Sequence, residues 1–121
     1  MIGRTHPHPT DALPMLREKG LKKFAEVVTA DGHPLGSAMR FFHRAEAEVN
    51  PELRLYGTYL EIQSIELGGP SFVPTDFIAD YDARANRVTL AADFKMVVDE
   101  LWNRMPDFVA RGTGAVEELP G

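Results

Sequence analysis

The stretch YLEIQSIELGGPSFVPTDFIADYDARANRVTL, residues 59–90, predicts most of the fold. Its first part is rich in aromatic, aliphatic and β-branched residues, which suit a half-buried strand. Residues 68–70, Gly-Gly-Pro, then interrupt that run with residues that accept turn dihedrals. Phe72 and Val73 are typical of a return strand. The first half of the stretch therefore predicts a β-hairpin.

The second half of the stretch predicts a corner and another hairpin. Pro74 removes a backbone donor, and Thr75 and Asp76 offer side-chain oxygens to the amides that follow, so the strand should end there. Residues 79–81 and 88–90 then form short strands, joined by a polar turn that contains Asn86.

Upstream of this stretch, the sequence predicts another hairpin. Residues 24–29 form a strand, an Asp-Gly turn containing Gly32 follows, and residues 35–43 form the return strand. Gly36 inside that strand indicates a bulge or a close approach of two backbones. Residues 44–55 are acidic and interrupted by proline, which is typical of a loop insertion.

Residues 1–23 predict a flexible leader and a short helix. His6 and His8 could meet a metal ion, but they supply two ligands where a structural zinc needs four, so the sequence favours a disordered leader over a metal site. Asp11 can cap a helix that ends at Gly20.

A second helix is predicted after the last strand, at residues 93–105. Apolar side chains fall there at helical spacing: Phe94, Val97, Val98, Leu101, Trp102 and Met105. Asp93 can cap the start of this helix and Pro106 can end it. Residues 111–121 have little left to pack, so they predict a loose tail.

Composition and charge narrow the class of protein. The chain has 121 residues, 44% of them hydrophobic, which fits one globular domain at about residues 24–110. It contains no cysteine and no apolar run long enough to cross a bilayer, so we expect a cytoplasmic protein without disulfides or membrane insertion. The net charge is −5, and the basic residues concentrate near the start of the chain. An acidic body repels phosphates, so we expect no nucleic-acid binding.

Several of these motifs resemble the PRC-barrel family, which includes the reaction-centre H subunit and RimM-like ribosome-maturation barrels. The resemblance rests on VVTADGHPLGSA (residues 27–38) and SFVPTDFI (residues 71–78), and on residues 88–90 followed by a helix that carries Trp102. It covers about residues 24–105. It implies a mainly β fold, a small SH3-like antiparallel barrel with a C-terminal amphipathic helix. The chain departs from the family pattern in its acidic residues 44–55 and its short N-terminal helix.

The sequence shows no recognisable active site. Carboxylates that could act in pairs stand at Asp76, Asp80, Asp82, Asp99 and Glu100. Their positions are also typical of caps and turns, and solvated carboxylates are the more common case. His33 and His43 have no evident nucleophile beside them, and no glycine loop suited to phosphate is present. We therefore expect no catalytic residue, cofactor or metal.

The apolar side chains exceed what one small barrel can bury, which favours a non-catalytic protein-interaction or scaffold module. We expect its surface to combine strand 35–43 with helix 93–105, through Phe41, Phe42, Phe94, Val98, Trp102 and Met105. The partner is another protein or a second copy, with a homodimer favoured. The alternatives are an RNA-processing or ribosome-assembly accessory, as the RimM likeness implies, and a small-ligand-binding barrel.

Overall fold

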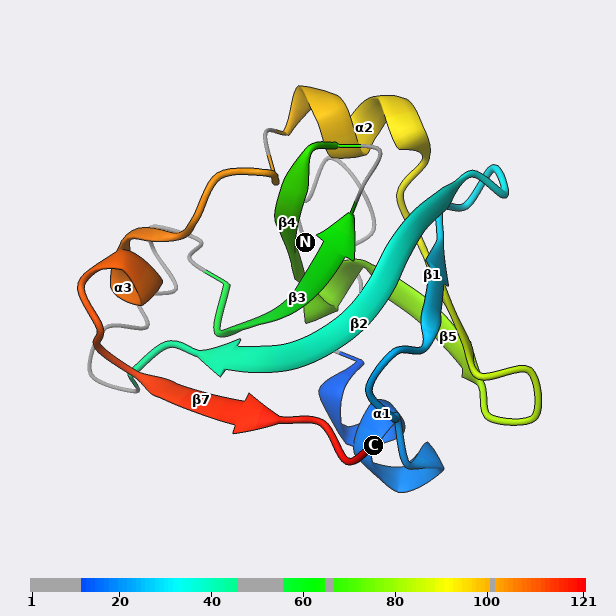
Figure 1. The fold of residues 1–121 in the computed structure, drawn as a ribbon, viewed down its shortest axis with the longest axis horizontal. Coiled ribbons are helices and arrows are strands. Elements are labelled where there is room, and N and C mark those ends of the chain that lie inside the picture. The colour runs from blue at the N-terminus through cyan, green and yellow to red at the C-terminus, as the bar shows by residue number, and fades with distance from the viewer. Residues whose placement is uncertain (1–11, 46–55, 65–66, 101) are drawn as a thin grey trace, which may run out of the picture.

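The computed structural model describes residues 12–45, 56–64, 67–100 and 102–121, and its fold is mainly β (Figure 1). The strands are β1 (Glu26–Val28), β2 (Pro34–His43), β3 (Thr58–Ser64), β4 (Gly69–Pro74), β5 (Ile78–Asp82), β6 (Arg87–Leu90) and β7 (Ala115–Glu118). The helices are α1 (Leu13–Lys19), the 3-10 turn η3 (Thr75–Phe77), α2 (Phe94–Asp99) and α3 (Asp107–Ala110).

All seven strands belong to one mixed sheet. Its order is β4-β3-β2-β1-β6-β5, and β7 pairs with β2 outside this path. The prediction of a purely antiparallel arrangement is wrong, because β1 runs parallel to β6. The two strands belong to different hairpins, and these hairpins lie side by side with β1 and β6 pointing the same way. Among the described residues no ladder joins β4 to β5, so the sheet is open there.

The β1–β2 hairpin has the predicted turn and the predicted bulge. Gly32 has a φ of +83°, which favours glycine. Val27 pairs with Gly36 and the next residue of β1 pairs with Pro34, so Leu35 is the extra residue of a bulge. A Cβ on Gly36 would lie 2.0 Å from the carbonyl oxygen of Gln63. Glycine is therefore required where the backbone of β2 lies against the end of β3.

The stretch at residues 59–90 folds as its pattern predicts. β3 and β4 form a hairpin, and the chain turns after Pro74 through η3 into β5. β5 and β6 form the next hairpin, in which Asn86 has a φ of +53°. The Tyr81 hydroxyl donates to the Asn86 side-chain oxygen at 2.6 Å. This bond ties the turn to the core, because Tyr81 is only 1% exposed.

The core lies against the inner face of this sheet. The strands contribute these buried side chains to it: Val27, Leu35, Leu60, Ile62, Ile78 and Val88. Helix α1 contributes Leu16 to the same core and ends at Gly20 in the left-handed conformation, as predicted. The residue at its N-cap is Ala12, which makes no side-chain cap.

Helix α2 is shorter than the predicted helix at residues 93–105. Asp93 caps it as expected, accepting from the Met96 amide at 2.8 Å, but the helix ends at Asp99. The chain then turns so that Trp102 packs on Phe77, with ring centroids 5.1 Å apart. The carbonyl oxygen of Trp102 accepts from the Phe72 amide at the edge of β4, at 2.6 Å. These tertiary contacts override the helical spacing.

The prediction of a loose tail at residues 111–121 is wrong. Residues 115–118 form β7 along the second half of β2, and Leu119 is buried in the core. The preceding turn α3 buries Phe108. Backbone pairing and ion pairs hold this segment, and neither leaves a periodic pattern in the sequence.

Other predictions lie outside the described residues, namely those on His6, His8, the cap at Asp11 and residues 46–55. In the part of the chain that the structure describes, no helix is both long and apolar enough to cross a membrane.

Candidate functional site

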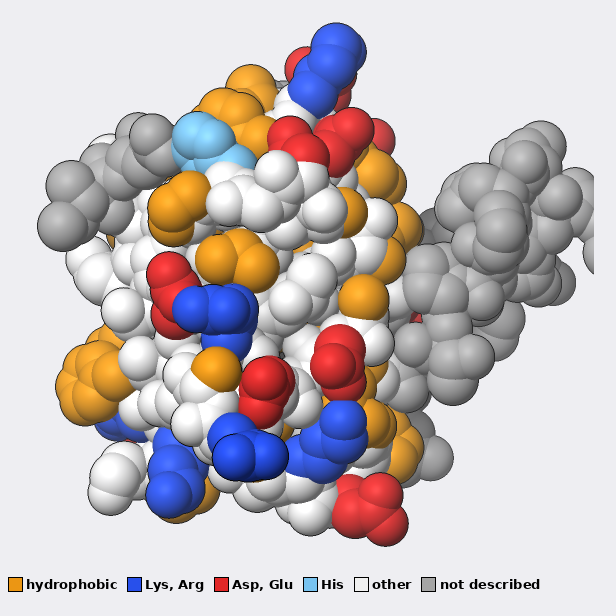
Figure 2. Space-filling model, turned by 90° about the vertical axis from the view of Figure 1, so that its right-hand side faces the viewer, with side chains coloured by type: hydrophobic (Ala, Val, Ile, Leu, Met, Phe, Trp, Pro, Cys, Tyr) orange, Lys and Arg blue, Asp and Glu red, His pale blue; other side chains and the backbone are white. Residues whose placement is uncertain are grey.

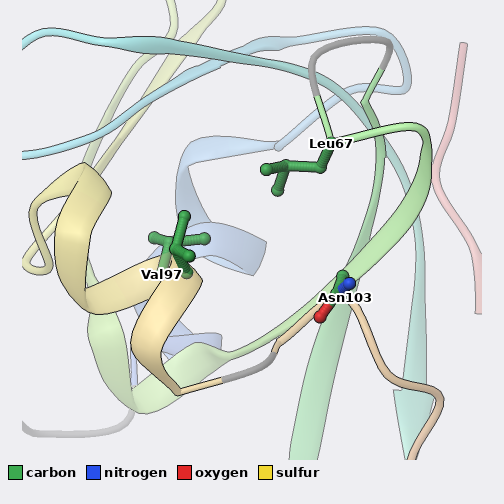
Figure 3. A pocket seen from close by; sticks show the side chains of 4 residues that line it. Leu67, Val97 and Asn103 are labelled. Carbon is green, nitrogen blue, oxygen red and sulfur yellow. The ribbon is translucent and has the colours of Figure 1, made fainter.

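A small hollow lies between α2 and the turn that joins β3 to β4 (Figure 3). It is lined by Leu67 from the turn, Val97 and Val98 from α2, and Asn103 from the segment after α2, and its volume is about 100 Å³. The lining is mostly apolar, with the amide of Asn103 as its polar group. The hairpin turn and the helix cap at Asp93 bring these sequence-distant side chains together.

Two residues of the predicted interaction surface are exposed, and one of them, Val98, lines the hollow. Val98 is 45% exposed on α2 and Met105 is 50% exposed in the segment that follows α2. Figure 2 shows hydrophobic side chains at the end of the molecule where α2 lies, next to acidic and basic side chains, and further hydrophobic side chains scattered over the same face. This end therefore offers apolar side chains to solvent.

The other predicted surface residues are drawn inward. Phe41 is 1% exposed and Trp102 is 7% exposed, so their placement on the surface was wrong for the isolated chain. Phe41 lies opposite Leu60 on the core face of the sheet, and Trp102 packs on the core. Phe94 is half-buried and stacks on His33, with centroids 4.0 Å apart. Phe42 is half-buried and contacts the ring of Phe72.

A second constellation, at the opposite end of the molecule, surrounds the two glutamates of β7. Its members, here called the β7 cradle, are Arg17, Lys23, Arg40 and His43. Arg17 contacts Glu117 at 2.5 Å, and His43 Nε2 contacts the same carboxylate at 2.7 Å. Lys23 and Arg40 contact Glu118 at 2.8 and 2.7 Å. Basic groups from three separate segments thus converge on two neighbouring carboxylates.

The cradle changes the acidity of both glutamates. Partial burial acts to raise the pKa of Glu117, but hydrogen bonds from Arg17 and His43 outweigh it and leave the pKa below its ordinary value. The pKa of Glu118 is lowered by hydrogen bonds from Lys23 and Arg40. Both glutamates are therefore ionised at neutral pH, and only the ionised form makes ion pairs with the basic side chains.

Thr58, His43 and Glu117 form a hydroxyl–imidazole–carboxylate row. The Thr58 hydroxyl lies 3.0 Å from His43 Nδ1, and His43 Nε2 lies 2.7 Å from Glu117. Such a row can activate a hydroxyl as a nucleophile where the oxygen faces a substrate. Thr58 is only 6% exposed, however, and Glu117 is shared with Arg17. In this arrangement the row ties β7 to β2 and β3.

Three of the carboxylates considered as catalytic pairs have a basic or backbone partner. Asp80 contacts Lys19 at 2.9 Å, and Asp99 contacts Lys95 within α2 at 2.5 Å. Asp82 accepts from the backbone amides of its own turn. The described part of the chain contains no group of three or more His, Cys, Asp or Glu side chains placed to hold a metal ion.

The sequence alone missed Leu67 and the β7 cradle. The consecutive acidic residues Glu117 and Glu118, set against the basic cluster near the start of the chain, were the signal that could have indicated the cradle.

A scan against protein-family models, a search of curated proteins and a search of solved structures each gave no match to this chain.

Proposed function

We propose that this chain is a non-catalytic protein-interaction module with a PRC-barrel-like core, and that it forms a homodimer through the hollow beside α2. The observation that carries the proposal is the exposure of Val98, 45%, at the rim of that apolar hollow. An exposed aliphatic side chain next to an apolar recess is a self-complementary feature, and a two-fold axis places the same patch on both subunits.

The barrel-like core is supported by the way the open sheet ends. β4 and β5 are the outermost strands of the hydrogen-bonded path, yet only the three residues of η3 separate them in the chain. The corner therefore keeps one end of β4 next to one end of β5. We interpret the sheet as a barrel opened along this seam.

The size of the hollow favours a side chain of a protein over a small ligand as its occupant. Its volume is about 100 Å³. Pockets for small molecules usually have about 300–1,000 Å³ and several convergent polar groups. Asn103 is the one side-chain amide among the residues that line this hollow. The small-ligand alternative therefore has less support.

The pairing of basic side chains favours a protein partner over RNA. Arg17, Lys23 and Arg40 contact the glutamates of β7, and Lys19 contacts Asp80. Arg87 contacts Glu26 in the same way. A basic group that already has a carboxylate partner is less available to a phosphate, so the ribosome-assembly alternative has less support.

The test is the oligomeric state of the full chain and of two matched variants. Sedimentation should show a dimer of the 13.5 kDa chain at high micromolar concentration. Val98→Lys should shift it to monomer, because a charge would have to be buried in the apolar contact. Val116→Lys is the control, since Val116 is also exposed, at 59%, and lies on β7 at the other end of the molecule (Figure 1).

A wild-type monomer that also captures no protein from a nuclease-treated lysate would overturn the proposal. A dimer that Val98→Lys leaves intact would show that another surface is used.

A further inference from the structure

The segment that forms β7 is held in an unusual way for a strand of a sheet. It pairs with Arg40–His43 of β2, but Ala115, Val116 and Glu118 are all exposed, and Glu117 is half-buried. Backbone hydrogen bonds and the β7 cradle therefore account for most of its attachment. The burial of Leu119, just beyond the strand, adds an apolar contact.

The cradle would be basic if β7 were absent. Arg17 is 54% and Glu117 40% exposed, so their contact is open to water. Arg40 would keep Glu61 as a partner at 2.7 Å, but Arg17 and Lys23 would lose the carboxylates they now contact. The edge of β2 would also present unpaired backbone groups. Such an edge can form backbone hydrogen bonds with an extended peptide, and the basic side chains beside it can pair with acidic residues of that peptide.

The connection to β7 contains residues that permit rearrangement of the backbone. Gly112 and Gly114 have φ values of +73° and +80°, and they flank Thr113, whose amide donates to Phe108. Glycines populate both signs of φ, so a change of φ at Gly112 and Gly114 carries little backbone strain.

We propose that the edge of β2 at Arg40–His43, together with the β7 cradle, is a docking site for an extended partner segment with two consecutive acidic residues, and that residues 115–118 occupy this site in cis. Recognition combines strand addition, which supplies backbone hydrogen bonds, with charge pairing at two adjacent positions. This surface is separate from the hollow beside α2, and its occupant differs in chemistry from the second copy proposed there.

The test uses the full chain with its own strand weakened. In Glu117→Gln/Glu118→Gln the cradle loses both carboxylates, so the amides of residues 115–118 should exchange with solvent faster than in the wild type. A fluorescent peptide GAVEELPG should then bind about tenfold or more tightly to this variant than to the wild type, where the cis segment competes at high effective concentration. The affinity should fall as salt is added.

Matched controls isolate the contribution of charge. The peptide GAVQQLPG should bind at least about tenfold more weakly than GAVEELPG. Glu26→Gln removes the carboxylate of another exposed ion pair, Arg87–Glu26, and should leave peptide binding as in the wild type. If the double variant fails to fold, the wild type provides the measurement: peptide at about millimolar concentration should displace β7 and shift the Val116 methyl resonances.

Three results would overturn the proposal. Unchanged protection of residues 115–118 in the double variant would show that the cradle does not hold the strand. Equal binding of the two peptides would contradict recognition of the acidic residues. If the edge of β2 becomes exposed and binds neither peptide, it is not a docking site for an acidic segment. A dimer that exchanges β7 between copies would replace that partner with a second copy of the chain.

Discussion

β3 and β7 flank the same half of β2, yet they are attached to it by different physical effects. β3 pairs along most of β2 and buries Leu60 and Ile62 completely, while Val116 in β7 remains 59% exposed. β7 is attached by backbone hydrogen bonds and by the ion pairs of the β7 cradle. Membership of a sheet therefore does not imply a share in its core, and only one of these strands should control global stability.

The largest effect is expected from Gly36→Ala, which acts where the backbone of β2 lies against the end of β3. The new Cβ would lie 2.0 Å from the Gln63 carbonyl oxygen, so the backbones must separate. We expect the free energy of unfolding to fall by about 4 kcal/mol or more, measured by urea denaturation. Gly32→Ala is the control, because its Cβ would meet no atom within 4 Å and only the positive φ opposes it. The control should cost about 1 kcal/mol. Similar losses for the two variants would contradict the close approach of Gly36 to Gln63.

Leu60→Ala should have the next largest effect, since it removes a buried side chain of β3. Leu60 is 0% exposed and packs in the core, so the loss should be about 3 kcal/mol in the same assay. Val116→Ala makes the matched change in β7 and should alter the free energy of unfolding by less than about 0.5 kcal/mol. Equal effects would mean that β7 shares the core after all.

Gly114→Ala should detach β7 while leaving the rest of the sheet folded. Its Cβ would lie 2.1 Å from the His43 carbonyl oxygen, a clash as close as the one at Gly36, but at the entry to β7. We expect a cost of about 1–2 kcal/mol and fast amide exchange confined to residues 115–118. Global unfolding as severe as that of Gly36→Ala would show that β7 is integral to the core.

Acid should loosen β7 before it affects β3. The pKa values of Glu117 and Glu118 lie below their ordinary value of 4.5 in the folded chain. Carboxylates with lowered pKa values stabilise the fold above 4.5, and this contribution is lost as the pH falls through the folded pKa values. The Val116 methyl resonances should therefore shift below about pH 4.5 while those of Leu60 stay constant. Concerted changes at both positions would contradict a separate β7.

The sequence predicted the strands correctly where buried and exposed residues alternate along the chain. The alternation at residues 59–90 predicted both hairpins and the corner at Pro74, because each strand there has an apolar face set by the core. It was uninformative for β7, whose attachment depends on charged partners far away in the chain, such as Arg17 and Lys23.

The helical stripe shows a different failure. Val97, Trp102 and Met105 have helical spacing, yet only Val97 is buried by a helix. Trp102 is buried by a turn that also supplies a carbonyl to the edge of β4. Helical spacing alone does not distinguish one long helix from a short helix followed by an inward turn. Of the predicted surface residues, Trp102 is therefore buried, whereas Val98 is exposed.

The parallel ladder between β1 and β6 has a consequence for the order of folding. Its partners Glu26 and Arg87 are 61 positions apart in the chain. The three hairpins β1–β2, β3–β4 and β5–β6 each close over a short turn. This ladder must instead close a long loop and join two hairpins that the β3–β4 hairpin separates in the chain. We expect the β1–β6 ladder to form late, and the rate of folding to be set by this docking step.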